Sequence, residues 1–175
     1  MKVIIASDIH GNLEYVSKLD ELIQKERPDK LVLLGDLYYH GPRNGLPKEY
    51  DPVEVNKILN KYADKIIAVR GNCDAEVDNM ISEFDISKDY EEIILDGNKC
   101  YITHGHLFDK LENIIKNDYV FYGHTHVYDL SDKKINPGSV GFPKVNKEHT
   151  VILYENKMLN LINLDNFERI DFKEI

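Results

Sequence analysis

The stretch KVIIASDIHGN, residues 2–12, contains the strand around which the fold is predicted to form. Lys2 to Ser7 is a short run rich in β-branched residues, which predicts a buried strand. Asp8 and His10 follow at its end, and a glycine then allows the sharp turn that leads to Asn12. Asn12 is a good N-cap residue, so the chain is expected to begin with a strand, a polar turn and a helix.

The alternation of strand and helix continues up to residue 69. Apolar residues at helical spacing follow Asn12, and further strands are predicted at 31–34 and 66–69 around a helix at 53–62. This order implies parallel strands with right-handed crossovers. After residue 74, turns at 96–98 and 155–157 predict antiparallel hairpins, with further strands at 119–122 and 170–172. We therefore expect a single α/β domain over residues 1–175, with two mixed β-sheets packed face to face and helices on the outside.

The bulk composition excludes several classes of protein. A chain of 175 residues with 42% hydrophobic and 30% charged residues is typical of one globular domain. No apolar run approaches the ~20 residues of a membrane span, and the N-terminus does not resemble a signal peptide, so we expect a cytoplasmic protein. The net charge of −9 argues against a protein that coats nucleic acid. Only Cys73 and Cys100 are present, which disfavours a disulfide scaffold or a thiolate zinc site.

Seven side chains suited to metal binding lie at predicted strand ends or in glycine-containing turns. They are Asp8, His10, Asp36, Asn72, His104, His124 and His126. The alternative is a chance scatter of polar surface residues, which would have to fall repeatedly at successive strand ends. The set offers enough nitrogen and oxygen ligands for two metal ions, the apparatus for phosphoester hydrolysis.

We assign these ligands to two mixed nitrogen and oxygen sites that share one carboxylate. Asp8, His10, Asp36 and His126 would hold one ion, and Asp36, Asn72, His104 and His124 the other. The absence of a thiolate suits Mn, Fe, Co, Ni or Zn and disfavours Ca or structural Zn.

The order of these motifs resembles the calcineurin-like metallophosphoesterases, and VRGNCD, THGHLF, YGHTH and NPGSV resemble the small bacterial YfcE-type phosphodiesterases among them. The resemblance extends from the first strand to about Lys144. It implies a four-layer α/β/β/α sandwich and a phosphodiesterase that uses two metal ions, typically manganese, on small diester substrates. It also implies in-line attack by a hydroxide that bridges the metals, positioned by Asp36 and Asn72.

The proton donor for the leaving group is not apparent from the sequence. Many relatives have a histidine directly after the GN motif, whereas this chain has Cys73, a poor proton donor near neutral pH, as the YfcE-type group also does. The acid is His106, a metal-bound water or absent. Alternatively, His106 supports the metal ligands, contacts the substrate or is a simple loop residue. Cys73 is either a packed residue or a substrate contact.

Other residues admit both a structural and a functional interpretation. Asn12 is first a helix cap and second a candidate contact to substrate phosphate. His40 and Arg43 lie in a long loop at 38–52, which is either solvated or a lid, with Arg43 as a phosphate contact. The eleven tyrosines indicate either the interface of a homodimer or higher homo-oligomer, or amphipathic core positions.

Three functions compete on the sequence alone. The leading hypothesis is a metal-dependent phosphodiesterase for small diesters. The same ligands would also serve a phosphomonoesterase or a nucleotide pyrophosphohydrolase. The third is a non-catalytic protein-binding scaffold of the same fold, whose members have lost several of the seven ligands that this chain keeps.

Overall fold

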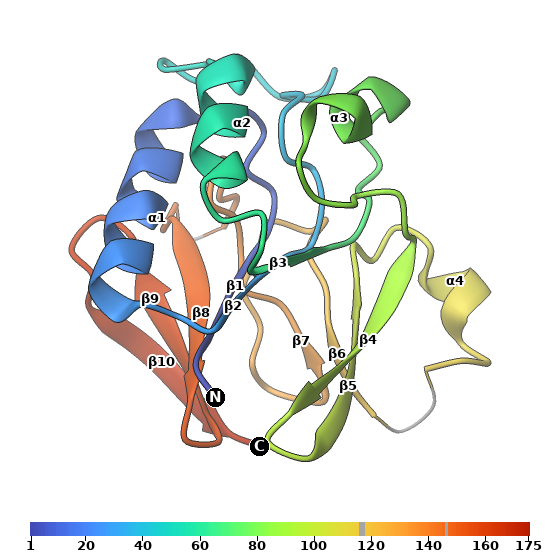
Figure 1. The fold of residues 1–175 in the computed structure, drawn as a ribbon. Helices are drawn as coiled ribbons and strands as arrows, with labels where there is room; N and C mark the ends of the chain where they lie inside the picture. Colours follow the sequence, from blue (N-terminus) through green and yellow to red (C-terminus); the bar gives the residue numbers. More distant parts are fainter. Residues whose placement is uncertain (116–117, 146) are drawn as a thin grey trace.

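Two β-sheets packed face to face form the centre of the molecule, which the computed structural model describes over residues 1–115, 118–145 and 147–175 (Figure 1). The first sheet contains β1 (Val3–Ala6), β2 (Lys30–Leu33), β3 (Ile66–Ala68), β8 (Thr150–Glu155), β9 (Met158–Asn163) and β10 (Arg169–Glu174). The second contains β4 (Tyr90–Leu95), β5 (Asn98–Thr103), β6 (Tyr119–Phe121) and β7 (Lys134–Ile135). The helices are α1 (Leu13–Glu26), α2 (Pro52–Asn60), α3 (Glu76–Ile81) and α4 (Phe108–Leu111).

Both sheets mix parallel and antiparallel pairs. The first has the strand order β10-β9-β8-β1-β2-β3, in which β1, β2 and β3 are parallel and β8 joins β1 antiparallel. The second has the order β4-β5-β6-β7, in which only β4 and β5 are antiparallel. In each sheet the parallel strands extend to one edge, β3 or β7, and antiparallel hairpin strands lie at the other.

The core lies in two layers on either side of the first sheet. Along β1, Ile4 and Ala6 pack with the apolar faces of α1 and α2, whereas Val3 and Ile5 pack into the space between the sheets. Successive side chains of a strand point to opposite faces. A strand such as β1 that is buried on both faces therefore needs apolar residues throughout.

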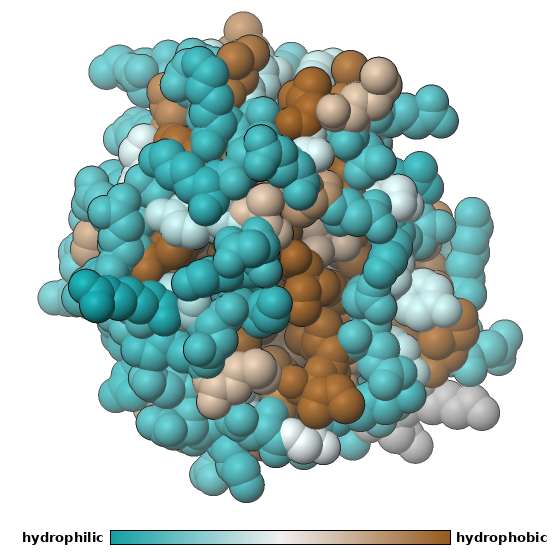
Figure 2. Space-filling view, in the orientation of Figure 1, coloured by the Kyte–Doolittle hydropathy of each residue, from teal (hydrophilic) through white to brown (hydrophobic). Residues whose placement is uncertain are grey.

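The short helix α4 packs against the second sheet and forms the fourth layer of the fold. The ring of Phe108 at the start of α4 packs edge-on against Tyr122, with 5.1 Å between centroids, and Leu111 is buried. Between β3 and β4 the two sheets leave a shallow apolar groove of about 290 Å³, visible as hydrophobic surface in Figure 2 and lined by residues such as Val32, Ile67 and Leu95.

The predicted architecture is confirmed, with differences in the elements. Each predicted strand is present, and its ends lie within three residues of the sequence-based bounds. The sequence did not predict α3, α4 or β7. Tyr38, Tyr101 and Tyr154 are buried, which supports core positions for these three tyrosines. No helix in the described part of the chain is long and apolar enough to cross a membrane.

Candidate metal centre

The seven predicted ligands follow strand ends that meet at one edge of the sandwich. Asp8, Asp36 and Asn72 lie a few residues beyond β1, β2 and β3. His104 directly follows β5, and the segment with His124 and His126 follows β6. Parallel strands bring their carboxyl ends to the same edge of a sheet, which is where ligands bind in α/β folds. Segments distant in sequence are thus brought together there.

Five of the seven predicted ligands have the left-handed backbone conformation. Their φ angles are 55° for Asp8, 52° for His10, 56° for Asp36, 67° for His124 and 59° for His126. Such angles are uncommon in residues other than glycine, and each costs about 1 kcal/mol or more unless the surrounding structure enforces it. A concentration of such residues is typical of functional sites, where turns direct side chains to a common point.

Three imidazoles are oriented by hydrogen bonds to backbone carbonyl groups. His10 Nδ1 donates to the carbonyl of Tyr39 (2.7 Å), and His104 Nδ1 donates to that of Leu34 (2.7 Å). His126 Nδ1 donates to the carbonyl of Phe142 (2.6 Å). A carbonyl can only accept, so Nδ1 carries a proton, and in the neutral imidazole the lone pair of Nε2 faces the centre. This arrangement is common in histidines that bind metal.

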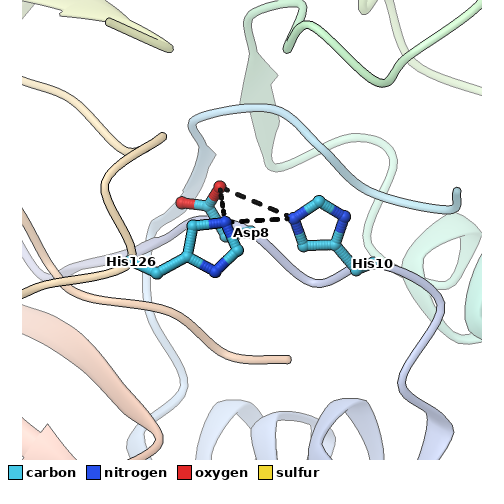
Figure 3. A group of neighbouring side chains, drawn as sticks. All are labelled: Asp8, His10 and His126. Carbon is cyan, nitrogen blue, oxygen red and sulfur yellow. Dashed lines mark hydrogen bonds and ion pairs between the residues drawn. The ribbon is translucent and has the colours of Figure 1, made fainter. Parts of the chain in front are cut away.

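The first group consists of Asp8, His10 and His126 (Figure 3). Asp8 Oδ1 lies 3.3 Å from His126 Nε2 and 3.8 Å from His10 Nε2, and the two Nε2 atoms are 3.4 Å apart. Asp8 Oδ2 accepts hydrogen bonds from Ser7 Oγ and the His124 amide. Oδ1 is buried and accepts no hydrogen bond from the described residues. A buried anionic oxygen without a donor fits a cation held between these three atoms.

The second group forms around Asp36 Oδ2. This oxygen lies 3.3 Å from His104 Nε2 and 3.6 Å from His10 Nε2, so it faces both groups. Asp36 Oδ1 accepts a hydrogen bond from the Cys73 amide (2.7 Å). Asn72 Oδ1 lies 3.1 Å from His104 Nε2, and the ring of His124 lies 5.2 Å from that of His104. Asp36 therefore uses one oxygen for structure and presents the other to ligands of both predicted ions.

The charges in the centre oppose the effect of burial on both carboxylates. Burial alone would raise the pKa of each, but neighbouring imidazoles lower it: His10, His104 and His126 for Asp8, and chiefly His104 for Asp36. Burial likewise opposes the charged form of His104, but its hydrogen bond to Asp36 and the charges of Asp8 and Asp36 raise its pKa to about 9. Both carboxylates are therefore anionic and able to bind cations.

Asp74 is a supporting residue that the sequence did not reveal. Its carboxylate accepts hydrogen bonds from the amides of Asp36 (2.8 Å), Leu37 (2.8 Å) and Gly71 (2.7 Å). It thereby joins the turn after β2 to the turn after β3. The only sequence signal was its place three residues after Gly71 in the VRGNCD segment.

The NPGSV segment anchors two of the ligand turns. Asn136 is fully buried and donates to the carbonyl of Gly123 (2.9 Å). Ser139 Oγ donates to the carbonyl of Asp8 (2.8 Å), which also accepts from the Gly141 amide (2.8 Å). The sequence singled out this segment only by its resemblance to the YfcE-type phosphodiesterases, and the structure brings it into contact with the Asp8 turn.

The remaining candidate residues differ in their positions. Asn12 caps α1 by accepting from the Tyr15 amide, and it donates to the carbonyl of Gly141, so the predicted cap is confirmed. His106 packs edge-on against His104, with 5.4 Å between centroids, and its buried Nδ1 has no hydrogen-bond partner in the part of the chain that the structure describes. Arg43 and Cys73 line the cavity beside the ligands. His40 lies away from that lining, against Tyr50.

The cavity over the ligands has a volume of about 750 Å³. It also exposes Lys144, which the sequence did not single out because nothing in its local pattern distinguishes it. The cavity is lined by His10, Asp36, Tyr39, Gly41, Pro42, Arg43, Asn44, Asn72, Cys73, Asp74, Ala75, His124, Thr125, His126 and Lys144. Its size is in the range of small-molecule sites.

Comparison with known proteins gives consistent results. Residues 1–158 match the model of the calcineurin-like phosphoesterase superfamily domain. The chain is 41% identical to Phosphodiesterase YfcE of Escherichia coli K12 over 171 residues, which cover 94% of this chain and 93% of that protein. It is 33% identical to Phosphodiesterase MJ0936 of Methanocaldococcus jannaschii, over 79% of this chain and 83% of that protein.

The fold is also similar to a solved structure. A phosphoesterase from Escherichia coli, described as Yfce, superimposes with a TM-score of 0.92 and 39% sequence identity, and the match covers 100% of both chains.

Proposed function

Because this chain belongs to the calcineurin-like phosphoesterase superfamily, we propose that it is a phosphoric diester hydrolase that uses two divalent metal ions on small substrates. One observation carries the proposal. Asp36 Oδ2 lies between His10 Nε2 and His104 Nε2, at 3.6 and 3.3 Å, with further nitrogen and oxygen ligands on either side. The relatives named as phosphodiesterases support the diester preference.

The donor set fits two ions. The buried Asp8 Oδ1, without a hydrogen-bond donor, would complete one site with His10, His126 and Asp36 Oδ2. Asp36 Oδ2, Asn72 Oδ1, His104 and His124 would form the other. Mixed nitrogen and oxygen ligands suit Mn, Fe, Co, Ni or Zn, and we propose manganese. When bound, such a pair of ions lowers the pKa of a water molecule and neutralises charge on the phosphate.

The residues of the chain hold this arrangement in place before substrate binds. Hydrogen bonds from Nδ1 to backbone carbonyls fix three imidazoles, and Asp74 ties the Asp36 turn to the Asn72 turn. Little rearrangement is then needed during the reaction, which is the condition for effective electrostatic stabilisation.

His106 lies beside His104 and His124, and we propose it as the side chain that contacts the leaving group. Its Nδ1 is buried without a hydrogen-bond partner among the described residues, and its ring lies 6.2 Å from that of His124. Burial, and then the charges of His104 and His124, lower its pKa, so its neutral form predominates near neutral pH. We propose that it donates a hydrogen bond to the leaving oxygen but transfers no proton in the rate-limiting step. Esters of acidic alcohols such as phenols, whose oxygens can leave as anions, should then react fastest.

The proposed function can be tested by removing the metal. Protein dialysed against EDTA should lose activity on bis(p-nitrophenyl) phosphate by on the order of 10³-fold, since metal ions supply several kcal/mol of charge stabilisation. Activity should return with Mn²⁺. The panel should include p-nitrophenyl phosphate and cyclic nucleotides. Activity that survives chelation would contradict the metal requirement, and faster turnover of the monoester would favour a phosphomonoesterase.

Replacement of Cys73 by serine should have little effect on catalysis. Burial first, and then the charges of Asp36 and Asp74, raise the pKa of the Cys73 thiol to about 12, so it is a poor proton donor. Loss of a general acid costs about 10²–10⁴-fold in rate. We expect kcat/KM of Cys73→Ser on bis(p-nitrophenyl) phosphate to stay within about threefold of wild type, well short of that loss. A fall of about 10²-fold or more would assign Cys73 a catalytic role.

A further inference from the structure

The cavity over the ligands contains two cationic side chains that bind no other part of the described chain. Among the described residues that line it, Arg43 and Lys144 are the only lysine or arginine. Both are exposed, and neither side chain forms a hydrogen bond or ion pair within the described residues. A singly charged diester bound at the seven ligands would leave both of these cations without an anion.

The backbone places both residues beside the same part of the centre. Lys144 follows Phe142, whose carbonyl orients His126, and its own amide donates to the His126 carbonyl (3.3 Å). Arg43 follows Tyr39, whose carbonyl orients His10. The two segments are therefore attached to His10 and His126, which face each other in the first ligand group.

The segment with Arg43 is itself held in a defined turn. The Asn44 side chain donates to the carbonyl of His40 (2.8 Å), and the Asn44 amide donates to that of Gly41 (3.3 Å). The neighbouring Tyr39 side chain, 42% exposed, also lines the cavity. The backbone thus holds the two cationic residues in defined positions at the cavity, and the Tyr39 ring lines it as well. This arrangement suits a substrate with a planar group and a second anion.

We propose that Arg43 and Lys144 form a second phosphate subsite, so that the enzyme prefers nucleotide-like diesters that carry an additional phosphate group. This inference rests on the proposed function, because the scissile diester would occupy the seven ligands. Arginine and lysine both bind phosphate, through a planar fork in one case and a point charge in the other. The volume of about 750 Å³ can accommodate such a substrate.

A matched pair of substrates tests the proposal. One is the p-nitrophenyl ester of thymidine 5′-phosphate, and the other is the same ester with a 3′-phosphate. For wild type we expect kcat/KM to be about tenfold higher on the second, mainly through KM. Arg43→Ala and Lys144→Ala should each lower that ratio about threefold, and the double variant should bring it close to one.

Two neighbouring lysines provide matched controls. Lys48 lies on the loop of Arg43 and Lys147 on that of Lys144; both are exposed and neither lines the cavity. Lys48→Ala and Lys147→Ala should keep the wild-type ratio. If these variants lowered the ratio as much as Arg43→Ala and Lys144→Ala, the effect would come from general surface charge and the subsite would be wrong.

Binding to the metal-free protein gives a second readout. Thymidine 3′,5′-bisphosphate should bind more tightly than thymidine 5′-monophosphate by isothermal titration calorimetry, and the double variant should lose the difference. A wild-type enzyme that cleaves both esters equally well would overturn the subsite and leave the proposed function intact. Failure to cleave either ester in the presence of Mn²⁺ would instead count against the function itself.

Discussion

Replacing Asp36 with asparagine is expected to abolish hydrolysis while preserving the fold. Asp36 Oδ1 accepts a hydrogen bond from the Cys73 amide, so the amide oxygen of asparagine takes that position. The NH₂ group then occupies the place of Oδ2, next to His10 and His104. It cannot bind a cation. Loss of about 4 kcal/mol of charge stabilisation corresponds to a fall of ~10³-fold in kcat/KM.

Metal content and stability separate this effect from simple unfolding. Inductively coupled plasma analysis should show that Asp36→Asn retains at most one of the two ions, while its circular dichroism spectrum remains that of wild type. Asp64→Asn makes the same chemical change at an exposed position outside the cavity and should match wild type in both respects. An Asp36→Asn protein with full metal content and full activity would refute the bridging role.

Gly71→Ala is expected to disrupt the same site from the other side. A methyl group at Gly71 would overlap both the backbone nitrogen and the Oδ1 atom of Asp36. The φ angle of Gly71 is not in the left-handed region, so the cost is steric. Backbone atoms cannot rotate away, and we expect the free energy of unfolding to fall by about 3 kcal/mol, the upper part of the usual range for an overpacked site.

The displaced Asp36 should also lower activity, by on the order of 10²-fold, as is common when catalytic groups move by about 1 Å. Gly45→Ala is the matched control, because nothing lies within 4 Å of a Cβ there and no left-handed φ is involved. That variant should be as stable and as active as wild type in urea unfolding and steady-state assays. A Gly71→Ala protein with the stability and activity of Gly45→Ala would show that the close approach is not needed.

The sequence predicted most of the fold because its central strands are uniformly apolar. The β1 segment VIIA is buried on both faces, and runs of this kind are easily recognised. α3 was missed because Asp78 is its only buried residue and Val77 and Met80 face solvent, so no apolar stripe of helical period marks it. α4, with four residues, and β7, with two, are too short to show any periodicity.

The convergence of the ligands was predictable from their positions at strand ends, but the contacts around them were not. The roles of Asp74 and Asn136 depend on backbone groups from turns that lie far away in the sequence. Lys144 reaches the cavity from a loop without any pattern of its own. The prediction that the two sites share the Asp36 carboxylate left open whether one or both of its oxygens would bridge. The Cys73 amide occupies Oδ1, so we now predict bridging through Oδ2 alone.

Anomalous diffraction from crystals grown with Mn²⁺ would decide whether the seven ligands form two sites joined by Asp36. We expect two manganese peaks per chain, roughly 3.5–4 Å apart and both in contact with Asp36 Oδ2. One should also contact Asp8, His10 and His126, and the other Asn72, His104 and His124. A single peak, or a second peak that does not touch Asp36, would contradict the shared site.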